Sequence, residues 1–299
     1  MARVDSNVVY GMYSGLALLM DVHYPERPNG LGIVVVAGSG WHAPLSYDAT
    51  PLKARPPEAA ANGRAWTPDP LRDAGYTVFT VNHRAAPRFR YPAAVEDVQR
   101  AVRYVRHHAA DFAIDPDRIG ATGNSSGGHL VSMLGVLDGD GDPDDPDPVN
   151  RESARVQCVV AGAAPSDLLR FIKEPVSGRD AVASFLGTYL APVLPPSSIE
   201  YRTYQEASPI SYVSKDSSPF LLMHGDADEV VPFEQAEVME HALRDYGVEV
   251  KLIRVEGGGH GPDFRGPGYT GAAIAVDFLG EMVGWFNQHL QKTVGAAAR

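Results

Sequence analysis

Short apolar runs alternate with segments of helical periodicity along almost the whole chain. The run at 33–36 is apolar at every position, as expected of a strand that helices cover on both faces. The segment 92–110 instead repeats its apolar residues at three- and four-residue spacing, which predicts an amphipathic helix. This alternation predicts an α/β fold with a mostly parallel, doubly wound sheet in a single domain. We expect strands at 17–23, 32–37, 76–82, 118–122, 156–161, 220–224 and 249–255, and further helices at 128–134, 233–246 and 271–289.

Three longer stretches interrupt this pattern. Residues 41–70 are rich in proline and alanine, residues 139–148 are mostly Asp, Gly and Pro, and residues 165–213 place short apolar pieces among Pro and Ser. Loops this long inside a compact domain are usually functional or disordered. We therefore expect residues from about 165 to 213 to form a small cap over an active site, with the long loop 41–70 beside it.

The composition is that of an ordinary soluble globular protein, with 44% apolar and 21% charged residues among 299. The formal net charge of -11 argues against binding to nucleic acid, whose phosphates require a basic surface, and against docking on an anionic membrane. No apolar stretch near the N-terminus is long enough for a secretory signal or a membrane span. We expect a cytoplasmic protein that has neither a nucleic-acid nor a membrane partner.

Cys158 is the only cysteine, so the chain can form no intrachain disulfide. It lies in the apolar run 156–160, and no base motif accompanies it. We therefore expect a buried, inert thiol rather than a nucleophile.

The acidic stretch 138–142 resembles the start of a calcium-binding loop. Pro143, however, occupies the position where such a loop requires glycine, and Val149 stands where its final glutamate belongs. Neither a dinucleotide-binding glycine motif nor a phosphate-loop lysine is present in the sequence. We expect no metal and no cofactor.

The segment Gly123-Asn124-Ser125-Ser126-Gly127 matches the Gly-x-Ser-x-Gly pattern of a nucleophile elbow. An expected strand leads into it and an expected helix leads out, which is the setting that this motif requires. The nucleophile must occupy a sharp, strained turn, so the residues two positions away need minimal side chains, and only Ser125 has glycine at both. The turn also directs the backbone N–H of Ser126 towards a developing oxyanion. We interpret Ser125 as the nucleophile.

Candidates for the acid and the base follow the last two expected strands. Asp226, Asp228 and Glu229 come after the first of these strands, and any of them could orient an imidazole and stabilise its charged form. Of the ten histidines, His260 alone lies on a glycine-rich loop after the last expected strand. The chain order serine, acid, histidine is that of α/β-hydrolases rather than of the chymotrypsin or subtilisin types.

These residues make the chain similar to the hormone-sensitive-lipase-like and BD-FAE-like esterases of the α/β-hydrolase superfamily. The similarity runs from about residue 15 to the C-terminal helix and is closest over 83–98 and 114–130. The resemblance implies the α/β-hydrolase fold. It also identifies Asp228, the second Asp after His224-Gly225, as the triad acid, and Asp226 as a supporting hydrogen-bonding residue.

The similar esterases usually carry His-Gly-Gly-Gly-Trp after the third strand, where this chain has Ala-Gly-Ser-Gly-Trp at 37–41. The resemblance implies that the backbone N–H groups of Ser39 and Gly40 form an oxyanion hole together with that of Ser126. Because the donors are backbone N–H groups, a serine in place of glycine at position 39 can be tolerated if the loop keeps its turn. The alanine at position 37, however, removes a histidine that usually braces this loop.

The sequence therefore predicts a serine carboxylesterase in which Ser125, Asp228 and His260 cleave small, short-acyl esters through an acyl-enzyme intermediate. Trp41 is a candidate wall of the substrate pocket, with a packing role as its alternative. The same triad would serve an amide hydrolase such as an arylformamidase, because fold does not settle substrate. A non-catalytic binding protein on this scaffold is a third hypothesis, which predicts that the three triad residues lie far apart. Some similar esterases form dimers through the last strand and helix, so the resemblance also implies a homodimer as a candidate oligomeric state.

Overall fold

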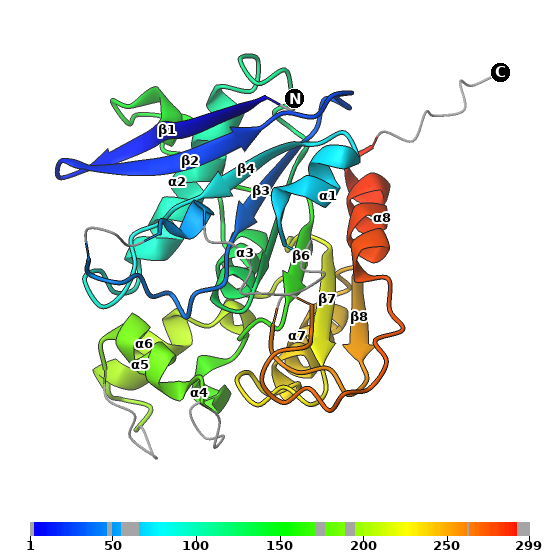
Figure 1. Ribbon diagram of the computed structural model, residues 1–299. Coiled ribbons are helices and arrows are strands. Elements are labelled where there is room, and N and C mark those ends of the chain that lie inside the picture. The colour runs from blue at the N-terminus through cyan, green and yellow to red at the C-terminus, as the bar shows by residue number, and fades with distance from the viewer. Residues whose placement is uncertain are drawn as a thin grey trace.

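A computed structural model describes residues 3–46, 50–54, 66–171, 177–188, 195–261 and 263–291. Within these residues the centre is an eight-stranded sheet in the order β1-β2-β4-β3-β5-β6-β7-β8, with helices packed on it (Figure 1). β2 pairs antiparallel with both β1 and β4, and all the other neighbours are parallel. This confirms the predicted α/β fold with a mostly parallel sheet. The strands are β1 (Val4–Tyr13), β2 (Leu16–His23), β3 (Gly32–Val36), β4 (Thr77–Val81), β5 (Ile119–Asn124), β6 (Val159–Gly162), β7 (Phe220–Gly225) and β8 (Val250–Val255).

The helices lie on both faces of the sheet and at its carboxyl edge (Figure 1). None of the helices that the structure describes has both the length and the apolar character to cross a bilayer. The helices are α1 (Pro68–Asp73), α2 (Ala93–His107), α3 (Ser126–Val136), α4 (Leu168–Phe171), α5 (Arg179–Leu186), α6 (Ile199–Glu206), α7 (Glu234–Asp245) and α8 (Phe278–Leu290), with short 3₁₀ turns at Leu52–Ala54, Pro148–Arg151 and Pro209–Tyr212.

Strand β1 is the main element that the sequence pattern did not predict. Its pairing with β2 changes register at two places, and side chains such as Val9 and Met12 remain exposed. Irregularities of this kind break the alternation of buried and exposed residues that identifies a strand in a sequence.

Short helices occupy parts of the stretches that were expected to be loops. α1 lies at the end of the predicted loop 41–70, and α4, α5 and α6 lie within the predicted cap, each with eight residues or fewer. Residues 47–49 and 55–65 of the loop, and residues 172–176 and 189–194 of the cap, lie outside the described residues.

Helix α8 begins later than expected. The predicted start at residue 271 is wrong, because the helix starts at Phe278. Gly271 has a left-handed φ of 79°, which a helix cannot contain, and the Asp277 side chain caps the first turn by accepting from the Gly280 N–H at 2.9 Å.

Two apolar layers enclose the sheet. On one face α2, α3 and α7 bury side chains such as Val98, Leu130 and Met239. On the other face α1 and α8 bury Leu71 and Trp285. Because both faces are covered, β3 and β4 are buried along their whole length, which explains why β3 is apolar at every position and why even the two threonines of β4 are buried.

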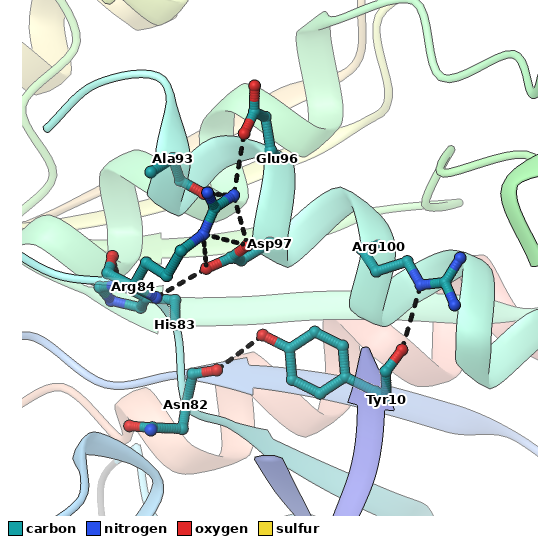
Figure 2. A network of polar contacts seen from close by, with 8 residues as sticks. All are labelled: Tyr10, Asn82, His83, Arg84, Ala93, Glu96, Asp97 and Arg100. Carbon is teal, nitrogen blue, oxygen red and sulfur yellow. Dashed lines mark hydrogen bonds and ion pairs between the residues drawn. The ribbon is translucent and has the colours of Figure 1, made fainter. Parts of the chain in front are cut away.

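The segment 83–98 builds a buried ion-pair network at the start of α2 (Figure 2). Arg84 donates to the Asp97 carboxylate from its backbone N–H at 2.6 Å and from Nε at 2.9 Å. Its guanidinium also donates to Ala93 O at 3.2 Å and to Glu96 Oε2 at 2.8 Å. These contacts fix the chain that leaves β4 against the first turn of α2.

Tyr10 connects β1 to the same region. Its hydroxyl donates to Asn82 O at 2.6 Å, and Arg100 Nε on α2 donates to Tyr10 O at 3.1 Å (Figure 2). The Tyr13 ring lies 3.8 Å from Arg84 Cζ, within cation–π range. Polar contacts thus fasten the irregular edge strand to the helix layer.

Asp97→Ala tests how strongly this network stabilises the fold. Asp97 is 1% exposed, and its removal leaves the buried Arg84 guanidinium without its main counterion. We expect the free energy of unfolding to fall by about 3–5 kcal/mol. Glu96→Ala is the matched control, because this partner of the same guanidinium is 56% exposed; we expect a loss below about 1 kcal/mol. Denaturant unfolding measures both, and equal losses would show that burial does not set the strength of the pair.

Candidate active site

The three predicted triad residues meet at the carboxyl edge of the parallel strands. Ser125 directly follows β5, Asp228 follows β7, and His260 follows β8. His260 Nε2 lies 3.0 Å from Ser125 Oγ, and His260 Nδ1 lies 2.7 Å from Asp228 Oδ2. An ionised Asp228 accepts from the Nδ1–H, which leaves Nε2 free to accept from the Ser125 hydroxyl. This is the geometry of a nucleophile, a base and a group that orients the base.

The turn at Ser125 has the strained backbone expected of a nucleophile elbow. Its φ of 52° and ψ of -127° lie outside the regions that L-residues prefer. A Cβ on Gly127 would lie 2.1 Å from Val36 O, and one on Gly123 would lie 2.6 Å from the same oxygen. The two glycines are therefore needed because the end of β3 presses against the turn.

Asp228 accepts three hydrogen bonds and has a second imidazole nearby. Its Oδ1 accepts from the N–H groups of Val230 and Val231, each at 2.8 Å. Its Oδ2 accepts from His260 and lies 3.3 Å from His224 Nε2. Burial alone would raise the pKa of this carboxyl, but the hydrogen bonds from His224 and His260 outweigh burial and hold the pKa well below its usual range. The carboxylate is thus ionised wherever the enzyme is folded near neutral pH.

Of the three candidate acids, Asp228 alone contacts the histidine. Asp226 takes the supporting position, because it accepts from the Gly257 N–H at 2.7 Å and from Arg254 Nε at 2.8 Å. It thereby joins the end of β7 to the turn that leads to the base. Glu229 is exposed on the surface of the loop.

The three expected oxyanion donors differ in their hydrogen bonding. The Ser39 N–H already donates to Ser126 Oγ at 2.8 Å. Within the described residues, neither the Gly40 N–H nor the Ser126 N–H has an acceptor. Gly38 N–H donates to Asn124 Oδ1 at 3.2 Å, which holds this loop against the nucleophile turn. Two of the three N–H groups thus lack an acceptor in the described part of the chain, whereas the Ser39 N–H already has one.

Trp41 has the contacts of its packing alternative rather than those of an open pocket wall. It is 2% exposed, and its ring stacks on Phe185 with centroids 4.6 Å apart. Its Nε1–H donates to His129 Nδ1 at 3.1 Å. His129 is fully buried, and its Nε2 donates to Ala207 O at 2.7 Å.

Helix α5 lies against two parts of the site. A Cβ on Gly40 would lie 3.2 Å from Ala181 Cβ, and one on Gly178 would lie 2.6 Å from Val230 O. Just before the helix, the Ser177 N–H donates to Glu229 O at 3.3 Å. The same short helix therefore touches the 37–41 loop and the loop that carries Asp228.

Sequence reasoning missed His224 and the acceptor role of the Ser126 hydroxyl. His224 begins the segment that carries the acid, so a histidine two residues before Asp226 was the available signal. No sequence pattern identifies Ser126 Oγ as an acceptor, because this depends on a side-chain direction. Cys158 is buried, as expected, and burial raises the pKa of its thiol. In the part of the chain that the structure describes, no group of His, Cys, Asp or Glu residues could hold a metal ion.

The burial of His129 predicts a pH dependence of stability. Burial lowers the pKa of this imidazole from 6.5 to about 4, against a smaller opposing effect of the Ala207 hydrogen bond. The unfolded chain therefore binds the proton first, and stability falls as pH drops below about 6.5 and continues to fall towards the folded pKa. Between about pH 7 and pH 5, wild type should lose about 2 kcal/mol more of its free energy of unfolding than His129→Asn. Parallel slopes for the two proteins would contradict this.

The chain is similar to proteins of known family. The BD-FAE family model matches residues 20–243. "Probable carboxylic ester hydrolase LipM" from Mycobacterium tuberculosis is 31% identical over 76% of this chain and 51% of its own length. The chain thus spans about half the length of the curated relatives that it matches.

Two similar solved structures are described as an esterase and an ester hydrolase. One, described as a truncated form of carbohydrate esterase from gut microbiota, has a TM-score of 0.76 and 28% identity, and the match covers 97% of each chain. Another, an acetyl ester-xyloside bifunctional hydrolase from Caldicellulosiruptor lactoaceticus, has a TM-score of 0.72 and 25% identity over 95% of this chain and 96% of that one.

Proposed function

The chain belongs to the BD-FAE family, and from this we propose that it is a serine carboxylesterase that acts on small, short-acyl esters. The observation that carries the proposal is the position of His260, which lies 3.0 Å from Ser125 Oγ and 2.7 Å from Asp228 Oδ2. The relatives named as ester hydrolases support the same reaction class.

In the proposed reaction, His260 Nε2 takes the proton of the Ser125 hydroxyl as Oγ attacks the ester carbonyl. The N–H groups of Gly40 and Ser126 stabilise the tetrahedral oxyanion. The Ser39 N–H becomes a third donor once it exchanges its acceptor, Ser126 Oγ, for the oxyanion. The imidazolium then protonates the leaving alcohol, and the acyl group remains on Ser125. A water molecule, deprotonated by His260, releases the acid and restores the serine.

We propose that residues from about 165 to 213 form a cap over this site. The contacts of α5 with the 37–41 loop and with the loop after β7 support this position. A cap of this size leaves room for a modest pocket, which favours short acyl groups. A neighbour described as an acetyl ester-xyloside hydrolase is consistent with this preference.

A para-nitrophenyl ester series from acetate to laurate tests the proposal directly. We expect turnover to be highest with short chains and to fall by about a thousandfold or more in Ser125→Ala, because removal of the nucleophile leaves only the oxyanion hole and binding. Ser132→Ala is the matched control, since it removes another buried serine hydroxyl of the same region, which donates to Gly128 O at 2.7 Å. Turnover of para-nitroformanilide but not of the esters would favour an arylformamidase. Equal inertness of wild type and Ser125→Ala would contradict a hydrolase.

Asp228→Asn tests the role of the acid without changing its shape. In wild type, Asp228 Oδ1 accepts from the N–H groups of Val230 and Val231, each at 2.8 Å, and the Oδ1 of an asparagine can keep both hydrogen bonds. Its amide would then point a donor at His260 Nδ1 and favour the tautomer that carries the proton on Nε2. That tautomer cannot accept from Ser125, so we expect kcat to fall by about ten-thousandfold. Stopped assays at neutral pH measure this fall, and a loss below tenfold would show that Asp228 does not orient the base.

A further inference from the structure

His129 lies where three parts of the candidate site meet. Its own backbone belongs to α3, one turn beyond the nucleophile, and its N–H donates to Ser125 O at 2.9 Å. Its Nδ1 accepts from Trp41 Nε1, and its Nε2 donates to Ala207 O, the residue after α6. One buried side chain thus connects the nucleophile helix, the 37–41 loop and the end of α6.

The two hydrogen bonds fix the state of the imidazole. An indole N–H can only donate, so His129 Nδ1 must accept, and a carbonyl oxygen can only accept, so Nε2 must carry the proton. Both nitrogens of the fully buried ring are therefore satisfied by one neutral tautomer. An apolar side chain of similar size would pack there but would leave the Trp41 N–H and Ala207 O without partners.

Trp41 needs such a partner because its backbone is strained. Its φ is 56°, in the left-handed region, and the preceding Gly40 has a φ of 63°. A non-glycine residue in this region is strained and persists only where its surroundings hold it. The surroundings here are the stack on Phe185, the hydrogen bond to His129 and the bond from the Ala86 N–H to Trp41 O at 2.8 Å.

We propose that His129 is a positioning residue for the oxyanion hole, which it sets by holding the Trp41 indole and, through it, the Gly40 N–H. This inference rests on the proposed esterase function. The Gly40 N–H is one of the two free donors at the site, and it is adjacent to Trp41 in the chain. A displaced indole would turn this N–H away from the oxyanion, while leaving Ser125, His260 and Asp228 in place.

Two substitutions break the hydrogen bond from Trp41 Nε1 to His129 Nδ1, here called the indole bond, one at the donor and one at the acceptor. Trp41→Phe keeps a ring for the Phe185 stack but removes the donor. His129→Gln can still reach Ala207 O with its amide nitrogen, but its shape offers no acceptor at the Nδ1 position. We expect each to lower kcat per active site by about 10- to 100-fold, which reaches the roughly hundredfold lower end of the cost of losing one oxyanion-hole donor, with KM changed by less than about threefold. The affinity for a trifluoromethyl ketone, which forms an oxyanion on Ser125, should fall by the same factor as kcat/KM.

Two further variants separate positioning from a merely structural role. His129→Asn places an acceptor oxygen at the Nδ1 position, so it should keep the indole bond and retain more of kcat than His129→Gln. The double variant Trp41→Phe/His129→Gln should be no slower than Trp41→Phe alone, because both changes break one hydrogen bond. Ser132→Ala, on the same helix, should lose stability without losing kcat per active site.

The outcomes distinguish this inference from the proposed function. If wild type hydrolyses esters and Ser125→Ala does not, but both indole-bond variants keep full kcat per titrated active site, the positioning role is wrong and the esterase stands. A lowered melting temperature with unchanged kcat and unchanged ketone affinity would give His129 a structural role only. If wild type itself turns over no ester, the proposed function fails and the inference fails with it.

Discussion

The close approach of the β3 carboxyl end to the turn at Ser125 constrains every other part of the candidate site. Val36 O would lie 2.1 Å from a Cβ on Gly127 and 2.6 Å from one on Gly123. With glycine at both positions, the chain after β3 passes directly beside the nucleophile. Gly38 N–H then reaches Asn124 Oδ1, and Ser39 N–H reaches Ser126 Oγ. The loop that carries the proposed oxyanion donors lies next to Ser125 because the backbone leaves no room for side chains between β3 and α3.

The electrostatics of the site follow from a second constraint, which is the burial of a charge. Asp228 has a side chain that is 0% exposed, and a buried carboxylate is costly unless donors surround it. Val230 and Val231 supply backbone donors and His260 supplies an imidazole donor, while His224 Nε2 lies 3.3 Å away. The backbone bonds keep the carboxylate in one orientation, and the carboxylate in turn orients the His260 ring through Nδ1.

The sequence predicted the elements whose physical cause is local. Continuous apolar runs identify strands covered on both faces, and the glycines around Ser125 identify the sharp turn. Chain order and the resemblance then selected Asp228 and His260, which the structure places 2.7 Å apart. Strand β1 escaped prediction because its two register shifts disrupt alternation. Helices α4, α5 and α6 escaped it because they are too short to show a period.

Side-chain directions account for the rest of what the sequence could not supply. That Ser126 Oγ accepts from the Ser39 N–H depends on a rotamer, and no spacing rule encodes a rotamer. Trp41 illustrates the same limit, because a tryptophan after a glycine-rich loop is equally compatible with a pocket wall and with packing. Its partners Phe185 and His129 come from segments more than eighty residues away, so only the tertiary structure could decide between the two.

Helix α5 contacts both the 37–41 loop and the loop that carries Asp228, so in the proposed cap it would connect substrate binding to the reaction. Ala181 faces Gly40, Phe185 stacks on Trp41, and Gly178 lies against Val230 O. Binding energy raises kcat only when it is realised in the transition state. An acyl group that moves α5 would shift the oxyanion donor and the support of Asp228 together, so its fit would change kcat as well as KM. The proposed cap would thus select substrates through the position of the oxyanion donors as well as through the size of the pocket.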